Sequence, residues 1–259
     1  MRSTTLPQII PTLSKLYHKI IAIDTLKQHI QLTSSQTLKN TQIYKIIYYL
    51  KSKWYVISCK KDLFYIKPPE SQIAHEDIIA QRYHKLLKQH CTNDVGTYRY
   101  IGGISALEYQ YGSSYLNTDE VIIINELKTA TEVICFDKTI TYKSYRDASK
   151  SSIFTQTKKY STLCPVGAIK IRVASLELSI IESLYSPSTN QQAYITELVR
   201  KILKKHKKTL NWSVLESIIR LGKFHSSYNR LYQIMQKVDL TMADSVYALI
   251  KRFSYVMDV

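Results

Sequence analysis

Glycine and proline are scarce in this sequence, and each accounts for only six of the 259 residues. Three of the glycines nevertheless fall in one stretch, "YRYIGGISALEYQYG" (98–112), and Gly96 lies just before it. The stretch has neither the G-x-x-x-x-G-K pattern of a phosphate loop nor the G-x-G-x-x-G pattern of a dinucleotide site. We therefore predict a structural joint, with an extended segment, a tight turn at Gly102 and Gly103, and a helix that ends at Gly112.

Cysteine is also scarce, and the four cysteines are far apart in the sequence. No pair has C-x-x-C spacing, and no group of cysteine and histidine has the spacing of a zinc site. We therefore expect no metal site and interpret the cysteines as free thiols in a reducing cytoplasm. We expect His84, His90 and Cys91 to lie along a solvent-exposed helix.

Long apolar runs are absent, because none approaches the roughly 18 residues that a membrane span needs. The N-terminus also lacks the basic and then apolar pattern of a signal peptide. We expect a soluble cytoplasmic protein without a membrane partner.

Recognisable catalytic patterns are missing as well. "GISAL" resembles half of a nucleophile elbow around Ser105, but Leu107 occupies the position of the second glycine. Asp119, Glu126 and Lys128 match the D…E-x-K skeleton of metal-dependent nucleases, although an E-x-K is expected by chance in a lysine-rich chain. We therefore predict no catalytic residues, no cofactor and no enzymatic activity.

Positive charge is abundant and unevenly distributed. The formal net charge is +16, and the first 70 residues hold 11 Lys and Arg against 3 acids. Residues 71–197 hold 13 of each kind, whereas residues 198–210 hold 6 Lys and Arg and no acid. A basic segment at one end indicates a polyanionic partner, for which nucleic acid is the first candidate.

Three short helices are predicted at the N-terminus. Asp24 is a candidate N-cap for the second helix, and Ser34 or Ser35 for a third helix that runs from Gln36 to about Lys53. The first helix has an apolar face formed by Leu13, Leu16, Tyr17 and Ile20. The other two bury Leu26 and Ile30, and then Ile43, Ile46, Ile47 and Leu50.

Two strand-forming runs follow, "WYVIS" and "LFYIK", and they predict a hairpin with lysines at its tip. Three helices and a basic hairpin are typical of a winged helix-turn-helix, in which the third helix enters the DNA major groove and the wing meets the backbone. The expected DNA-contacting residues, at the third helix and the hairpin tip, are Ser34, Ser35, Gln36, Lys39, Asn40, Tyr44, Lys45, Lys60 and Lys61. The alternative is a protein-docking module whose lysines are simply solvated.

"KPPES" (67–71) predicts a domain boundary, since two prolines interrupt both ladders and helices. We therefore divide the chain into a winged helix-turn-helix domain, 1–70, and a second domain, 71–259. In the second domain we expect strands at 121–125, 132–136 and 139–143, and several helices within 191–256. The predicted fold class is α+β, with a mixed α/β domain that is helical from about residue 176.

Two helix starts are also expected in this domain. Ser175 is a candidate N-cap with Glu177 in the first turn, where an acid suits the helix dipole. Ser213 and Glu216 have the spacing of a capping box.

The segment "LVRKILKKHKKTL" (198–210) has an apolar side and a dense basic side. It predicts either a solvated amphipathic helix, a second contact with a polyanion, or a membrane-surface helix, although it lacks Trp and Phe. The basic residues of this C-terminal patch are Arg200, Lys201, Lys204, Lys205, Lys207 and Lys208.

Two segments together resemble the AbiEi family, the antitoxins of type IV toxin–antitoxin systems. These are "YIGGISALEYQYG" (100–112) and "VASLELSIIESLYSP" (173–187), in which Glu182 stands where the family usually has Asp. The resemblance covers nearly the whole chain in order. The expected wing sequence Arg-Gly-x-Tyr is here "KKDLFY", and Lys53 replaces a glycine that is common before the first wing strand.

This resemblance implies an antitoxin of an abortive infection system that serves in phage defence. It would repress its own promoter by binding inverted repeats in double-stranded DNA. It would also neutralise a nucleotidyltransferase-like toxin, without necessarily forming a stable complex. The alternative is a plain winged-helix transcription regulator whose C-terminal domain binds a partner or ligand.

Overall fold

The computed structural model describes residues 6–60, 62–69, 75–112, 120–127, 131–135, 138–145, 153–166, 169–185, 187 and 189–253. The protein has an α+β fold with two separate sheets. The chain divides into two compact units, one made of residues 1–83 with 134–137 and the other of residues 84–133 with 138–259. None of the described helices has the length and apolarity that crossing a membrane requires.

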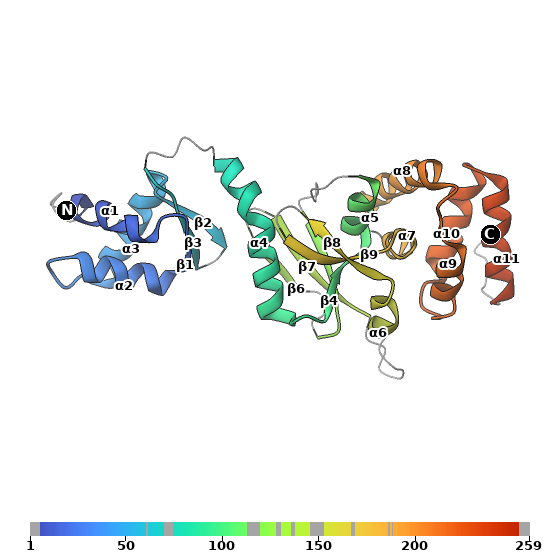
Figure 1. The fold of residues 1–259 in the computed structure, drawn as a ribbon, viewed down its shortest axis with the longest axis horizontal. Coiled ribbons are helices and arrows are strands. Elements are labelled where there is room, and N and C mark those ends of the chain that lie inside the picture. Colours follow the sequence, from blue (N-terminus) through green and yellow to red (C-terminus); the bar gives the residue numbers. More distant parts are fainter. Residues whose placement is uncertain are drawn as a thin grey trace. The chain divides into compact units, whose positions relative to one another are not determined.

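Residues 6–66 of the N-terminal unit form three α-helices, a 3-10 helix and a three-stranded antiparallel sheet of order β1-β3-β2 (Figure 1). In chain order the elements are α1 (Leu6–Thr12), η1 (Leu13–Leu16), β1 (Ile20–Ala22), α2 (Ile23–Thr33), α3 (Asn40–Ser52), β2 (Val56–Lys60) and β3 (Leu63–Ile66). The side chains that α2 and α3 were expected to bury do form the core, together with Ile9, Leu13, Ile21, Val56, Phe64 and Ile66. The hairpin prediction is also confirmed.

Three N-terminal predictions are wrong. The first helix lies earlier, at α1, and the chain after it narrows to η1 before Ile20 enters strand β1. This strand has only three residues and is held by pairing with β3, more than 40 residues away, so local periodicity could not indicate it. Asp24 lies in the first turn of α2, whose N-cap is Ala22. Helix α3 begins at Asn40 rather than Gln36.

The second unit is built on a six-stranded mixed sheet of order β6-β7-β5-β4-β9-β8. Strands β4 and β9, and β5 and β7, pair in parallel, whereas β4 with β5 and β8 with β9 pair antiparallel. The strands are β4 (Arg99–Ile101), β5 (Glu120–Asn125), β6 (Thr131–Cys135), β7 (Lys138–Ser144), β8 (Ser161–Val166) and β9 (Ile169–Ala174). All three strands expected between 121 and 143 are confirmed.

Helices surround this sheet and form the C-terminal end of the chain (Figure 1). Helix α5 packs on α7, α7 packs on α8, α9 and α10, and α10 packs on α11. The helices are α4 (His75–Val95), α5 (Gly103–Tyr111), α6 (Ile153–Lys158), α7 (Leu176–Leu184), α8 (Thr189–His206), α9 (Trp212–Ile219), α10 (His225–Gln236) and α11 (Leu240–Arg252). The expected helical C-terminal region is confirmed.

The glycine cluster is the joint between β4 and α5, as the sequence predicted. A Cβ atom at Gly102 would lie 2.4 Å from Ile124 Cγ1 and 2.5 Å from Glu182 Oε2, so a side chain has no room there. Gly103 has a φ of 54°, in the left-handed region that favours glycine. Gly112 caps the C-terminus of α5 with a φ of 124°. The cluster therefore serves a close approach and two unusual backbone conformations.

Glu182 is the reason for the close approach. Its Oε2 accepts a hydrogen bond from the Gly103 backbone N–H at 2.9 Å, and its Oε1 accepts one from the Tyr100 hydroxyl at 2.6 Å. The Tyr145 hydroxyl also bonds to this carboxylate. Burial nevertheless raises the pKa of Glu182 to about 7, because three hydrogen bonds only partly replace the water that burial removes. The carboxyl group thus joins α7 to the start of α5.

Other polar side chains are also buried in the second unit. Ser105 Oγ donates to Glu120 O at 3.1 Å and accepts from Ile122 N at 3.0 Å, which ties α5 to β5. Ser175 caps α7 by accepting from Leu178 N at 3.3 Å, as predicted. Glu177 lies in the first turn, as expected, and accepts from Asn211 N at 2.8 Å.

The expectation for the histidines of α4 is wrong. His84, His90 and Cys91 are buried rather than solvent-exposed. His90 Nε2 lies 3.3 Å from Asp94 Oδ2, and the Tyr142 hydroxyl donates to Cys91 Sγ at 3.8 Å. Within the part of the chain that the structure describes, no group of His, Cys, Asp or Glu is arranged to hold a metal ion.

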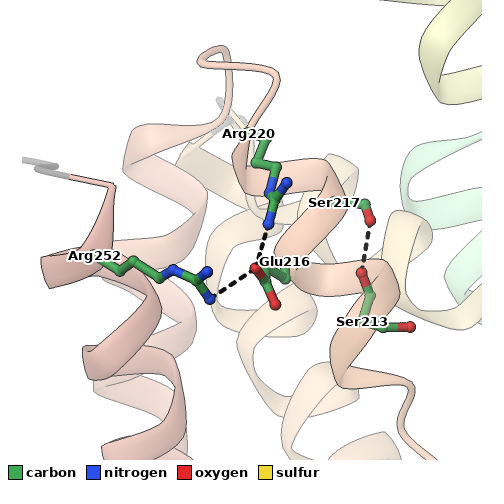
Figure 2. A network of polar contacts seen from close by, with 5 residues as sticks. All are labelled: Ser213, Glu216, Ser217, Arg220 and Arg252. Atoms are coloured by element: carbon green, nitrogen blue, oxygen red, sulfur yellow. Dashed lines mark hydrogen bonds and ion pairs between the residues drawn. The ribbon is translucent and has the colours of Figure 1, made fainter.

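The capping box predicted at Ser213 and Glu216 is also wrong. Asn211 is the N-cap of α9, and its Oδ1 accepts from Ser213 N at 3.1 Å and from Val214 N at 3.3 Å. Glu216 instead accepts from Arg220 at 2.6 Å and from Arg252 at 2.9 Å, so it joins α9 to α11 (Figure 2).

Candidate nucleic-acid interface

Helix α3 has one buried stripe and one exposed stripe. Ile43, Ile46, Ile47 and Leu50 are spaced as one helical face and are buried in the core of the N-terminal unit. The opposite face carries Tyr44, Lys45 and Tyr48, and Tyr48 has 77% of its side chain exposed. The sequence of α3 contains no acidic residue. The exposed face therefore offers phenol hydroxyls and ammonium groups, with no carboxylate on the helix to repel a polyanion.

The start of α3 determines where the other predicted residues lie. Lys39 is the N-cap residue, and its backbone N–H donates to Gln42 Oε1 at 2.8 Å. Lys39 and Asn40 are exposed at the first turn, as expected. Ser34, Ser35 and Gln36 precede the helix, and the Ser34 hydroxyl accepts from Gln36 N at 3.3 Å in a local turn. The predicted residues thus follow one another from the α2–α3 turn onto the helix.

A groove with a volume of about 510 Å³ lies against the outer face of α3. Ile23, Ile47 and Phe64 contribute its apolar surface, which comes from α2, α3 and β3. Its remaining lining residues, all from α3, are Tyr44, Lys45, Tyr48 and Lys51. Aromatic and basic side chains therefore alternate around one concave surface, a composition suited to contacts with sugar, base and phosphate.

Cation–π contacts hold some of these groups in place. Lys27 Nζ lies 4.7 Å from the centre of the Tyr44 ring and 3.6 Å from Asp24 Oδ1. Hydrogen bonding to Tyr44 raises the pKa of Lys27, so this ammonium group stays charged. Lys51 Nζ lies 5.9 Å from the centre of the Phe64 ring. Lys51 lines the groove and Lys27 contacts the Tyr44 ring that lines it, and the sequence prediction included neither lysine.

The two predicted lysines of the hairpin, Lys60 and Lys61, are described only in part or not at all. Lys60 ends β2, and nothing is described of its side chain, while Lys61 lies outside the described residues. The register of β2 against β3 shifts between Ser58 and Lys60, near the hairpin tip. Asp62 has a φ of 63° and accepts from Ile23 N at 2.8 Å, so the hairpin end is joined to the start of α2.

Sequence reasoning missed Tyr48 and Lys51 in the groove. The helical spacing of these two residues could have indicated them. Tyr48 follows Tyr44 by four residues and Lys51 follows Tyr48 by three, so the three side chains share one side of the helix. Lys27 had no such signal, since its position over Tyr44 arises from the packing of α2 on α3.

The C-terminal patch falls into two groups on and after α8. Arg200 pairs with Glu197 at 2.6 Å, Lys205 Nζ donates to Tyr111 O at 2.9 Å, and Lys207 pairs with Asp239. Lys201, Lys204 and Lys208 are exposed. Half of the predicted patch is therefore held by neighbouring groups of the protein, and three lysines lie outward.

No protein-family model matches the sequence, and no curated protein matches it either. Among solved structures, the chain is similar to the crystal structure of the RV2827C protein from Mycobacterium tuberculosis. The likeness has a TM-score of 0.56 at 10% sequence identity, over 99% of this chain and 83% of the other. At this identity it establishes similarity of fold alone.

Proposed function

We propose that this protein is a non-enzymatic antitoxin of the AbiEi family that binds the promoter of its own operon through a winged helix-turn-helix and represses it. The observation that carries the DNA-binding part is the exposed, acid-free face of α3, with its aromatic and basic groove beside β3.

The order of elements in the N-terminal unit supports a winged helix. Helices α2 and α3 are consecutive and in contact, and the hairpin of β2 and β3 follows α3 directly. Strand β1, between the first and second helices, completes a sheet of order β1-β3-β2. In a winged helix the third helix inserts into the major groove, and here that helix is α3.

The exposed residues of α3 have suitable chemistry for this role. The Asn40 amide is able to pair with an adenine edge, and the ammonium groups of Lys39 and Lys45 are suited to phosphates. Tyr44 and Tyr48 present rings for sugar contact and hydroxyls for phosphate oxygens. The net charge of +8 in the first 70 residues would supply the long-range attraction to DNA.

Fluorescence anisotropy with labelled promoter DNA tests this part. We expect Lys39→Ala with Asn40→Ala to weaken binding by about tenfold or more, since phosphate and base contacts are each worth about 1–3 kcal/mol. Lys85→Ala is a matched control, because Lys85 is an exposed lysine of α4 in the second unit. Equal affinity of the wild type and the α3 variant, with unchanged melting temperatures, would remove α3 from the DNA-reading role.

The antitoxin part rests on the family resemblance. Its two segments form adjoining pieces of the second unit, since Glu182 of the second segment bonds directly to Gly103 of the first. The resemblance therefore falls on residues that jointly build this unit. Neutralisation of a nucleotidyltransferase-like toxin is proposed for the second unit, with DNA binding in the first.

A growth assay separates the two activities. The adjoining gene of the operon is induced alone, with the wild-type protein, or with the Lys39→Ala/Asn40→Ala variant. We expect the adjoining gene to be toxic when it is induced by itself. Both the wild-type protein and the variant should restore growth, because the substitutions leave the second unit intact. Toxicity without rescue by the wild type, or no toxicity, would contradict the antitoxin assignment and leave a plain regulator.

A further inference from the structure

A small cationic pocket is lined by residues of α8, of α10 and of the end of α7. These helices belong to the helical C-terminal part of the second unit (Figure 1). Its volume is about 110 Å³, and its apolar surface includes Leu184, Ile195 and Ile234. Three cationic side chains line it: Arg200, Arg230 and Lys237. None of the described residues that line it is acidic. The three cationic side chains therefore concentrate positive charge in this pocket.

Most of the lining residues come from α8 and α10, and Leu184 and Pro187 come from the end of α7 and the segment after it. On α8 they include Gln192, Thr196 and Arg200, which are four residues apart in succession. On α10 they include Arg230 and Gln233, and Lys237 is the C-cap residue of this helix, so the three are spaced by three and four residues. Residues at these spacings share a helical face, so the two helices direct guanidinium, ammonium, amide and hydroxyl groups toward the same space.

Each of the two guanidinium groups already has one hydrogen-bond acceptor in the protein. Arg230 Nη1 donates to Leu184 O at 2.5 Å, and Arg200 Nη1 pairs with Glu197 Oε2 at 2.6 Å. A guanidinium has five N–H donors, and these contacts each use one, so donors remain for an anion in the pocket. Arginine forks match tetrahedral oxyanions better than lysine does, and Lys237 adds a third, flexible charge.

We propose that this pocket binds a phosphate group, either as free inorganic phosphate or as the terminal phosphate of a nucleotide. The volume decides the size of the occupant: it exceeds the roughly 10–15 Å³ that one water needs, and it is well below the roughly 300–1,000 Å³ of sites that enclose a drug-sized ligand. A phosphate fits this volume, while a nucleoside attached to it would remain outside. This site is independent of the proposed DNA-binding function.

Isothermal titration of the full-length protein with inorganic phosphate, in chloride buffer of matched ionic strength, tests the proposal. We expect saturable binding by the wild type and a Kd at least tenfold higher in Arg200→Gln and in Lys237→Gln. The controls are Lys201→Gln and Lys204→Gln, which remove the same charge from exposed positions of α8 outside the pocket, and we expect an unchanged Kd. Equal weakening in all four variants, or no saturable binding, would overturn the proposal.

Two further measurements sharpen it. Glu197→Gln removes the carboxylate that competes for Arg200, so we expect tighter phosphate binding, and a failure to tighten would contradict the role of Arg200. Titration with 5′-AMP distinguishes a nucleotide ligand from free phosphate. A lower Kd for 5′-AMP than for inorganic phosphate identifies a nucleotide, and an equal or higher Kd identifies free phosphate. If neither inorganic phosphate nor 5′-AMP binds, the assignment is overturned.

Discussion

The two units of this protein differ in where they place polar chemistry. Every buried side chain described in the N-terminal unit is aliphatic, aromatic or a cysteine, and the charged groups lie on the surface. The second unit buries Arg99, Glu108, Glu177 and Glu182 within hydrogen-bonded contacts. Surface substitutions in the first unit therefore test function, whereas interior polar substitutions in the second test folding.

The difference follows from how each core is assembled. In the N-terminal unit, short helices bury aliphatic stripes, and the core needs no polar partner. In the second unit, mixed strand pairing brings helix termini and strand ends into the interior, where backbone groups require hydrogen-bond partners. Glu182 and Ser105 supply such partners to Gly103 and Ile122.

The largest expected effect is in the glycine joint. We expect Gly102→Ala to destabilise the second unit by about 3 kcal/mol, because the new methyl group overlaps Ile124 and the Glu182 carboxylate. Urea denaturation followed by circular dichroism measures this loss. Gly96→Ala is the control, since Gly96 has a φ of 63° and nothing lies within 4 Å of its added Cβ, whereas Gly102 has an extended backbone with a φ of −127° and a crowded Cβ position. It should cost only about 1 kcal/mol. Equal losses would contradict the role of close packing against Ile124 and Glu182 at Gly102.

The next effect is a pH dependence that arises from Glu182 in the second unit. Burial raises the pKa of Glu182 from 4.5 to about 7, so between these pH values the folded protein binds a proton that the unfolded chain releases. Stability should therefore be fully retained below about pH 4.5 and fall as the pH rises toward 7, by about 3 kcal/mol from this group.

Glu182→Gln isolates this contribution, since glutamine does not titrate. We expect the stability of the wild type relative to the variant to decrease as the pH rises from about 4.5 to 7, measured in urea titrations at each pH. A difference that does not vary with pH would contradict the raised pKa of Glu182.

A smaller effect compares the basic residues of the two units on DNA. We expect Lys39→Ala with Lys45→Ala to reduce the salt dependence of promoter binding by about one to two ions, because each lost phosphate contact lowers the slope by about 0.9. Lys201→Gln with Lys204→Gln should change it less, since these residues belong to the second unit. A larger change in the second pair would place the main DNA contact at the C-terminal patch.

The smallest effect concerns the start of α9. We expect Asn211→Ala to cost about 1 kcal/mol, because two backbone N–H groups lose their acceptor. Ser213→Ala should cost less, since Ser213 only donates to Asn211 Oδ1 at 2.7 Å. Thermal melts of both variants measure the difference, and the reverse order would restore Ser213 as the cap.

Periodic and strongly apolar segments could be predicted from the sequence. The buried faces of α2 and α3, the hairpin, the strands between 121 and 143, and the exposure of Lys39, Asn40, Tyr44 and Lys45 all follow from patterns within a few residues. Helix starts were less predictable, since several cap residues compete locally. Asn211 rather than Ser213 caps α9, and α3 begins at Asn40 with Lys39, which is not a usual capping residue, at the N-cap position.

The sequence by itself determined the local elements of this protein and the concentration of charge at its N-terminal end, because both depend on residues near one another in the chain. Only the tertiary structure decided the pairing of β1 with β3, the position of Lys27 over Tyr44, the burial of His84 and the contact of Glu182 with Gly103. It likewise brought Arg200, Arg230 and Lys237 to one pocket. Each of these contacts joins elements whose spacing in the chain carries no periodic signal, so packing alone specifies them.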